Sequence, residues 1–410
     1  ITNFGPSAVM RSPRAKDQLE ALGELTCLLM QVSSTSDEAS VEEALDHLLE
    51  GWSTLAVDLQ VKEERDMLDA LAPYTGKVVR AFIDKCLRDA VKEVEEWDAA
   101  QVEQRLSIYA LDSFAPPKRI DDPAFGKPNG GRIDGALYWP NGGYVTDPAL
   151  SSQNMADAAR QHGAAFRLGV EVVEILQENG RVKGVKLASG EEIHAPVVVN
   201  VAGPGSAHIN GLAGVLDDMT IETRPLRQEV AHVPAPEGFD FDSLGMVVSD
   251  SDIACYIRPE HGNNILIGSE DPECDPHMWT ENDRDYNGDF TEQWNNQVMR
   301  YGQRVPSLGI PSQARGVVDL YDASTDWIPI YDKSALGGYY MACGTSGNQY
   351  KNAPIAGKMM AALIDYCEGG ADHDSTPLHY RLPYIGRDID VGFYSRSRPI
   401  NDESSFSVHG

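Results

Sequence analysis

The chain has 410 residues, of which 42% are hydrophobic and 8% aromatic, so it is long and apolar enough for two packed domains with a large core. Its formal net charge of −29 repels phosphate groups, and we therefore expect no nucleic-acid partner. No apolar run approaches the ~20 residues of a membrane span and no signal peptide opens the chain, so no membrane span is expected. The cysteines contain no C-x-x-C pair. This spacing argues against a zinc site or a disulfide scaffold and fits a reducing cytoplasm, so we expect a cytoplasmic protein without a metal site.

The N-terminal part of the chain predicts helices. Apolar residues recur at helical spacing from Ala15 to Met30, and again from Lys77 to about Trp97. Asp98 followed by Gln101 is typical of the start of a further helix. We expect a helical scaffold over residues 1–110, because this part shows no repeat and no group of residues with evident chemistry.

The hydrophobic pattern changes from a helical period to a period of two at about Val170. Asn179-Gly180 between two alternating runs is a strong hairpin signal. The continuously apolar run "PVVVN" is typical of a strand buried on both faces of a parallel sheet, and it leads into the glycine-containing loop "AGPGS" at Ala202–Ser206. A helix from Pro148 to Gly163 precedes a three-stranded meander, whose strands are expected at about Val170–Leu176, Val182–Leu187 and Glu191–His194.

The remaining sequence predicts a second domain and a return to the first. Strand-rich segments between Arg224 and about Ser269, followed by a helix near Gln293–Arg300, are typical of an antiparallel sheet with helices on one side. A short apolar strand then spans Tyr339–Cys343, and a helix follows from about Pro354 to Tyr366.

The loop "GTSGNQYKNAP" connects these last two elements. A glycine-rich turn between a strand and a helix directs backbone N–H groups and the positive end of the helix dipole at a ligand, so it suits a phosphate or a flavin edge. An ordinary tight turn is the alternative. Gly344 and Gly347 would let a flat ligand approach the backbone. Lys351 lies between the loop and a buried helix, where its charge is suited to a substrate carboxylate.

Other candidate residues have a plain structural alternative. The "AGPGS" loop is also typical of ordinary turns from strand to helix. Tyr256 and Arg258 lie on a predicted strand of the second domain, where such residues belong to the core or the surface more often than to a catalytic site. Arg224 and Arg227 are equally ambiguous.

Taken together, these stretches resemble the D-amino-acid oxidase superfamily of FAD-dependent oxidoreductases, in particular its glycine oxidase and sarcosine oxidase branch, from about Trp97 to Gly410. "GTSGNQYKNAPIAG" is similar to the sarcosine-oxidase loop G-x-S-G-H-G-F-K-x-x-x-x-x-G, which lines the flavin ring. The resemblance implies that Lys351 binds the substrate carboxylate. Asn348 stands where this family has His and Gln349 where it has Gly, so the contact with the flavin is expected to differ.

The resemblance also implies FAD as a cofactor that is not covalently attached. The cysteine that holds FAD covalently in sarcosine oxidase aligns with Asp319, and the arginine that clamps the carboxylate in glycine oxidase aligns with Tyr321. "ACYIRPE" is similar to the strand whose Tyr lies over the substrate, which makes Tyr256 a candidate. The residues implied at the catalytic centre are Lys351, Tyr256 and Tyr321, and those implied to contact FAD are Val172, Ala202, Gly203, Gly205, Gly344, Thr345, Ser346, Gly347, Asn348, Gln349, Tyr350 and Lys351.

The implied fold class is α/β and α+β. It combines an FAD-binding domain of the glutathione-reductase type, with a mixed or parallel sheet, an antiparallel-sheet substrate domain and a helical N-terminal region. The expected division is a helical region over residues 1–110, an FAD-domain part with the meander over 111–223, the substrate domain over 224–312 and a return to the FAD domain over 313–410.

One part of the family pattern is missing from the sequence. Members begin with a strand, G-x-G-x-x-G and a helix, which place the pyrophosphate at a helix N-terminus, and an acidic residue then binds the ribose. The first thirty or so residues contain neither these glycines nor the strand. Three explanations stay open: the sequence begins after the fingerprint, the N-terminal region has diverged, or the protein has lost FAD. The start at Ile1 favours the first.

Our leading hypothesis is an FAD-dependent oxidase or dehydrogenase that oxidises the C–N bond of a small amino acid or N-alkyl amino acid by hydride transfer to flavin. The substrate would be a small amine that carries a carboxylate, and both homo- and hetero-oligomers stay open. The competing hypothesis is a cofactor-free, non-catalytic scaffold or interaction subunit on the same fold. A third is a hydroxy-acid oxidoreductase.

Overall fold

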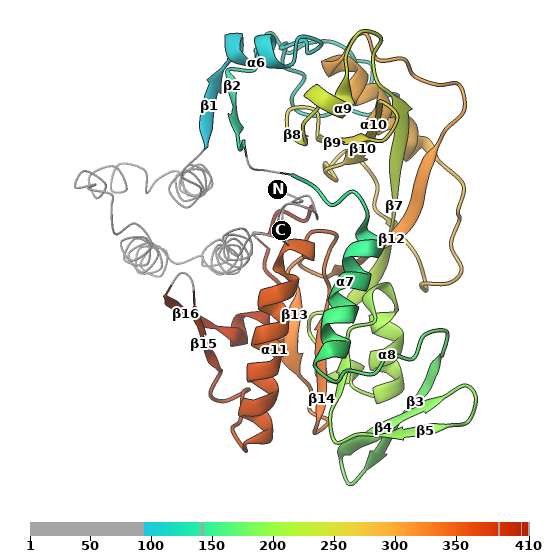
Figure 1. Cartoon of the computed structure of the whole chain (residues 1–410), viewed down its shortest axis with the longest axis vertical. Helices are drawn as coiled ribbons and strands as arrows, with labels where there is room; N and C mark the ends of the chain where they lie inside the picture. Colours follow the sequence, from blue (N-terminus) through green and yellow to red (C-terminus); the bar gives the residue numbers. More distant parts are fainter. Residues whose placement is uncertain (1–93, 141–142, 384–385, 403, 409–410) are drawn as a thin grey trace, which may run out of the picture.

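The computed structural model describes residues 94–140, 143–383, 386–402 and 404–408. The helices predicted between Ala15 and residue 93 lie outside these residues. Figure 1 shows an upper region built around a large sheet and a lower region built around a small sheet and a long helix. Two long strands, β7 (Thr223–Pro234) and β12 (Gly316–Ser324), pair with each other and run from one region to the other.

The upper sheet is antiparallel, as predicted for the second domain. Its other strands and the helices beside it are β8 (Val248–Asp250), β9 (Cys255–Glu260), β10 (Asn264–Ser269), β11 (Met278–Trp279), α9 (Phe241–Leu244) and α10 (Glu292–Arg304). The strand order is β11-β7-β10-β9-β8, and β12 pairs with β7. Successive side chains of a strand point to opposite faces of its sheet. Apolar residues on one face, such as Ile257 and Ile267, pack against Trp294 and Val298 of α10.

The lower sheet has the order β13-β14-β6, formed by β6 (Val198–Asn200), β13 (Ile330–Lys333) and β14 (Tyr339–Cys343). β6 and β14 are parallel, which confirms the parallel pairing predicted for the apolar run "PVVVN". Alternate residues of β14 enter two cores. Tyr340 packs with Met359 and Leu363 of α11 (Ala353–Glu368), whereas Met341 packs with Ala213 of α8 (Ser206–Ala213). The sheet therefore lies between α8 and α11.

The meander predicted ahead of the run "PVVVN" is confirmed. The prediction that this run is buried on both faces is wrong, because Val199 is 36% exposed whereas its neighbour Asn200 is buried. The strands of the meander, with the preceding helix, are β3 (Val172–Glu178), β4 (Arg181–Leu187), β5 (Glu192–His194) and α7 (Pro148–Gln161). β3 and β4 are joined by a two-residue turn in which Asn179 and Gly180 have φ of 51° and 74°. Both angles lie in the left-handed region that a type I′ hairpin turn requires, and Asn-Gly suits this turn best.

The prediction of a helix from Lys77 to about Trp97 is wrong at the C-terminal end of that helix. The elements here are β1 (Glu95–Asp98), α6 (Ala99–Arg105) and β2 (Gly135–Tyr138). The Trp97 ring stacks on Tyr138 with the ring centroids 4.2 Å apart and is only 5% exposed. Burial against a strand some forty residues later therefore overrides the local helical spacing. Asp98 and Gln101 form the capping box that the sequence predicts at the start of α6.

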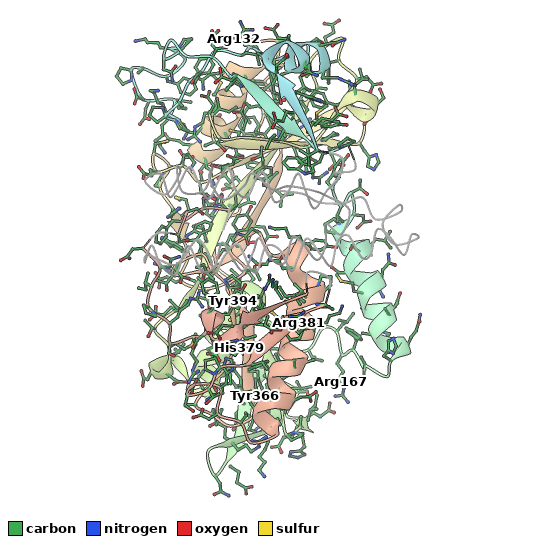
Figure 2. All side chains as sticks on the ribbon, turned by 90° about the vertical axis from the view of Figure 1, so that its left-hand side faces the viewer. Arg132, Arg167, Tyr366, His379, Arg381 and Tyr394 are labelled. Atoms are coloured by element: carbon green, nitrogen blue, oxygen red, sulfur yellow. The ribbon has the colours of Figure 1, made fainter. Side chains whose placement is uncertain are left out.

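The last described segment is held against the lower region by two arginines. Arg398 donates to both oxygens of Asp326, at 2.9 and 2.7 Å, and Arg396 contacts the carboxylates of Asp218, Asp332 and Asp374. Figure 2 shows Tyr394, just before these arginines, in the lower region. The remaining elements of this segment are the hairpin β15 (His379–Leu382) and β16 (Arg387–Asp390) and the 3-10 turn η5 (Val391–Tyr394).

Within the described residues, no helix is long and apolar enough to cross a membrane. No group of His, Cys, Asp and Glu in that part of the chain is arranged to hold a metal ion. The four cysteines it contains form no disulfide, and they are Cys255, Cys274, Cys343 and Cys367.

Candidate active site

The glycine loop (Gly344–Gln349) and the AGPGS loop (Ala202–Ser206) leave the lower sheet from the same edge. They follow β14 and β6, which are parallel neighbours. Ligands of open α/β sheets bind outside the carboxyl ends of such strands. The pairing therefore brings together the two loops that the sequence singled out as cofactor contacts.

The glycine loop lies along β12, on the edge opposite β7. The Ser346 N–H donates to the Asp322 carbonyl at 2.7 Å, and the Ser346 hydroxyl accepts from the Ser324 N–H at 3.2 Å. Ser346 is fully buried and has φ of 49°. The first half of the loop is thus hydrogen-bonded to β12 and largely buried.

Asp322 is a residue of this site that sequence reasoning missed. Its Oδ2 accepts the Gly344 N–H at 2.6 Å, and its carboxylate also interacts with the Thr345 N–H. The sequence predicted that the loop N–H groups point at a ligand, but those of Gly344 and Ser346 point at Asp322 instead. Burial raises the pKa of Asp322 to about 7, although these N–H groups act to lower it. Nothing in the local sequence signals this contact, because its partners are 22 residues apart.

Two predicted tyrosines meet at the other face of β12. The strand register places Tyr256 of β9 and Tyr321 of β12 on the face of the upper sheet that is turned away from α10. Their phenol groups interact, and burial raises the pKa of both. Both phenols therefore keep their protons near neutral pH and are suited to donate hydrogen bonds.

Glycines make room for both rings. A Cβ on Gly268 of β10 would lie 2.1 Å from the Tyr256 ring. A Cβ on Gly347, whose φ is +77°, would lie 2.5 Å from the Tyr321 ring. Real Cβ atoms do not approach so closely, so Gly347 is fixed here by contact with a ring as well as by its backbone angle. The structure thus brings Tyr256, Tyr321 and the glycine loop into one contact chain.

Lys351 lies just beyond the loop, in the turn η4 (Tyr350–Asn352), and is partly buried. Its Nζ donates to the Asn348 carbonyl at 2.7 Å. The ammonium group is therefore held close to the loop. The hydroxyl of Tyr350 contacts that of Ser151 on α7, which joins this turn to the helix before the meander.

The AGPGS loop forms a 3-10 turn, η2 (Gly203–Gly205), that leads directly into α8. The Asn200 side chain donates to the Ser206 carbonyl at 2.9 Å and fixes the start of the helix. A Cβ on Gly205 would lie 2.9 Å from the carboxylate of Asp283, so this acidic side chain covers the turn. Val172, the other predicted cofactor contact, packs at the margin of the apolar core beside α8.

Five buried polar atoms around the two loops have no hydrogen-bond partner in the part of the chain that the structure describes. They are Ser206 Oγ, Thr223 Oγ1, Asp322 Oδ1, Asn348 Nδ2 and Asn352 Oδ1. Thr223 lies beside the start of the glycine loop, since its methyl group would be 3.4 Å from a Cβ built on Gly344. A buried polar atom without a partner is costly, so this group indicates a place for a polar ligand. The polar loop, the glycines and these atoms fit the edge of a flavin, which presents both donors and acceptors.

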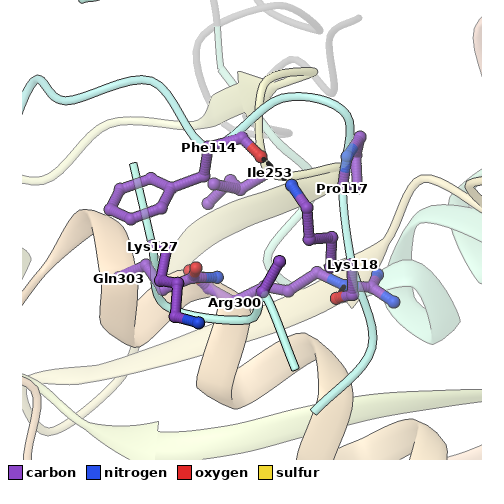
Figure 3. Close-up of a pocket in the computed structure, with 8 residues that line it drawn as sticks. Phe114, Pro117, Lys118, Lys127, Ile253, Arg300 and Gln303 are labelled. Atoms are coloured by element: carbon purple, nitrogen blue, oxygen red, sulfur yellow. Dashed lines mark hydrogen bonds between the residues drawn. The ribbon is translucent and has the colours of Figure 1, made fainter. Parts of the chain in front are cut away.

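A separate shallow hollow, too small to hold a ligand, lies in the upper region (Figure 3). It is lined by Phe114, Lys118, Lys127 and Arg300 among others. The Lys118 ammonium donates to the Phe114 carbonyl at 3.2 Å, and Arg300 donates to the Lys118 carbonyl at 2.9 Å. Arg300 thus ties this segment to α10, and the hollow belongs to this packing and not to the loops of the lower region.

Comparison with known proteins identifies the family. A family model described as FAD dependent oxidoreductase matches residues 43–363. The chain is 24% identical to hydrogen cyanide synthase subunit HcnC of Pseudomonas aeruginosa over 227 residues, which cover 54% of this chain and 50% of that protein. It is 24% identical to glycine oxidase of Geobacillus kaustophilus over 247 residues, or 58% of each chain. The chain therefore spans about half the length of the curated relatives it matches.

Solved structures show the same fold. L-proline dehydrogenase from P. horikoshii superposes with a TM-score of 0.56 at 18% identity, covering 89% of this chain and 84% of that one. Glycine oxidase from Geobacillus kaustophilus gives a TM-score of 0.52 at 19% identity, covering 89% and 85%. The arrangement of the two sheets, with loops following β6 and β14, agrees with the family match. The chain therefore belongs to the D-amino-acid oxidase superfamily of FAD-dependent oxidoreductases.

Proposed function

We propose that the protein oxidises the C–N bond of a small amino acid or N-alkyl amino acid with FAD as the hydride acceptor. The observation that carries this proposal is the contact chain from Tyr256 through Tyr321 to Gly347. It brings the face of the upper sheet that is turned away from α10 against the loop that the family uses for the flavin. The similarity to glycine oxidase supports an amino-acid substrate.

In this proposal the residues of the chain bind and orient the substrate. The Lys351 ammonium donates to the Asn348 carbonyl, and the proposal is that it exchanges this contact for the substrate carboxylate. Tyr256 and Tyr321 stay protonated, so they orient the substrate through hydrogen bonds and do not remove its proton. FAD, when bound, supplies the acceptor for the hydride from the substrate carbon.

We propose that the cofactor is held, without a covalent bond, by the AGPGS loop, the glycine loop and the turn that follows it. Val172 is proposed to contact the cofactor through the backbone of its strand, because its side chain packs at the margin of the core beside α8. The proposed domain division is unchanged, with the substrate domain over residues 224–312 between two parts of the FAD domain. HcnC is named as a subunit, which supports a search for association with a second chain.

The visible spectrum of the purified protein, with and without added FAD, tests the cofactor. Anaerobic mixing with glycine, sarcosine or proline is then expected to bleach the flavin bands, whereas lactate and glycerol 3-phosphate are expected to leave them. Bleaching by the hydroxy compounds alone would establish the hydroxy-acid alternative. A protein that stays colourless after FAD is added would support the cofactor-free scaffold.

Substitution of Lys351 tests the carboxylate contact. A desolvated charge pair of this kind contributes about 3 kcal/mol, so Lys351→Met is expected to raise KM about 100-fold. The flavin spectrum should stay as it is. Lys358→Met, on the exposed side of α11, is the matched control and should change KM less than twofold. Equal KM values for the two variants would remove Lys351 from the site.

A further inference from the structure

Asp322 stands at the point where β12 and the glycine loop meet. Three successive amides of the loop converge on this one residue, because those of Gly344 and Thr345 interact with its carboxylate and that of Ser346 with its carbonyl. Asp322 is 3% exposed. The hydrogen bonds to this carboxylate come from backbone amides, and no ion pair among the described residues joins it to a cation. Buried carboxylates in proteins are normally paired with a cation.

We infer that Asp322 is a positioning residue of the active site, and that its state of ionisation sets the shape of the glycine loop. The inference rests on the proposed function only in taking this loop as the one that faces flavin and substrate. Asp322 is assigned this role because the hydrogen bonds to its carboxylate come from the loop amides. It acts through Gly344 and Thr345, and beyond them through Gly347 against Tyr321 and the Asn348 carbonyl that holds Lys351.

The two ionisation states hold the loop differently. A carboxylate offers acceptors on both oxygens, and an N–H bond to it is roughly twice as strong as one to a neutral acceptor. When Asp322 is protonated on the unpartnered Oδ1, Oδ2 still faces the Gly344 N–H but becomes the oxygen of a neutral acid, which is a weaker acceptor. The loop is therefore expected to be held firmly in the ionised state and loosely in the protonated state.

The groups packed around Asp322 allow both states near neutral pH. From β14 the Cys343 thiol faces it, with its pKa raised by burial, and the Ser206 hydroxyl of α8 faces that thiol. Arg398, from the last described segment, also acts on Cys343 but is committed to Asp326. From β7 the neighbours are Thr223 and Pro225, and Tyr256 and Tyr321 lie on the other face of β12. Burial among these groups raises the pKa of Asp322 to about 7, so both states are populated at neutral pH.

Amide hydrogen exchange of the full chain tests the inference, followed by mass spectrometry on a peptide that spans residues 343–350. After correction for intrinsic exchange rates, the protection of this peptide should rise about tenfold between pH 5.5 and pH 8.5, which is the difference between N–H bonds to a neutral and to a charged acceptor. Asp322→Asn keeps the shape but cannot ionise, so its protection should stay at the lower level across the range. Asp319→Asn, an exposed position on the same strand, should keep the wild-type response.

A flat profile for the wild-type peptide would overturn the inference, and so would a loss of the response in Asp319→Asn equal to that in Asp322→Asn. The wild-type pH series needs no variant, so the inference can be tested even where Asp322→Asn fails to fold. With FAD added, the Kd for FAD should be about tenfold weaker at pH 5.5 than at pH 8.5 in the wild type and independent of pH in Asp322→Asn. A protein that binds no FAD would defeat the proposed function, but the exchange profile would still decide the role of Asp322.

Discussion

Gly347 offers a quantitative test of the contact between the glycine loop and the upper sheet. Replacing it with alanine introduces two costs. An L-residue in the left-handed conformation loses about 1–2 kcal/mol, and Gly347 has φ of +77°. The new Cβ would also lie 2.5 Å from the Tyr321 ring, and forcing extra atoms into a packed site costs about 1–3 kcal/mol more. Gly347→Ala is therefore expected to lower the free energy of unfolding by about 2–5 kcal/mol.

A control variant and a double variant separate the two costs. Gly190, in the turn between β4 and β5, has φ of +86° and nothing within 4 Å of an added Cβ. Gly190→Ala should therefore show the backbone cost alone, about 1–2 kcal/mol. In a Tyr321→Ala background the ring is gone, so Gly347→Ala should fall to this same value.

Urea unfolding followed by tryptophan fluorescence provides the measurement, with the four proteins of the double-mutant cycle compared at one pH. The expected coupling between positions 321 and 347 is about 1–3 kcal/mol, equal to the steric cost. Independent sites add to within about 0.5 kcal/mol. A coupling below that limit, or a cost of Gly347→Ala no larger than that of Gly190→Ala, would refute the contact.

Two further predictions concern the arginines of the last described segment. Arg398→Met leaves the Asp326 carboxylate, which is fully buried, without its cation, so a loss of about 3–5 kcal/mol is expected in urea unfolding. Adding Asp326→Asn should recover part of it, and no recovery would contradict the assigned pairing. Burial acts to raise the pKa of Asp374, but hydrogen bonds from Arg396 and Lys333 outweigh it and lower that pKa to about 2. The stabilisation is therefore present above pH 3.8 and is lost as the pH falls towards 2. Asp374→Asn should flatten this part of an acid titration, and superimposable curves would exclude the effect.

The features that could be predicted from the sequence are those fixed by local pattern. The type I′ turn at Asn179-Gly180 follows from two residues, and the strand Tyr339–Cys343 follows from an apolar run that ends at a glycine. The end of the helix predicted to reach about Trp97 was wrong because the partner of that tryptophan, Tyr138, is remote in the chain. Periodicity contains no information about a partner at that distance.

The candidate site divides in the same way. The glycine loop, Tyr256, Tyr321 and Lys351 were found by resemblance to a family, but their mutual contacts depend on the register of β12 with β7. Asp322 was missed because the family pattern gives it no role and its partners follow much later in the chain. The roles of all these residues stay predictions until the variants are measured.

Tyr321 and Asp322 are consecutive residues of β12, and each touches the glycine loop from its own side of the strand. Inserting or deleting one residue upstream in this strand would exchange the phenol and the acid between the two sides while the composition of the site stayed the same. Which side of β12 carries the phenol and which carries the acid therefore depends on whether each residue occupies an odd or an even position along the strand. A homologue with the same pair of residues shifted by one place should have lost both contacts at once.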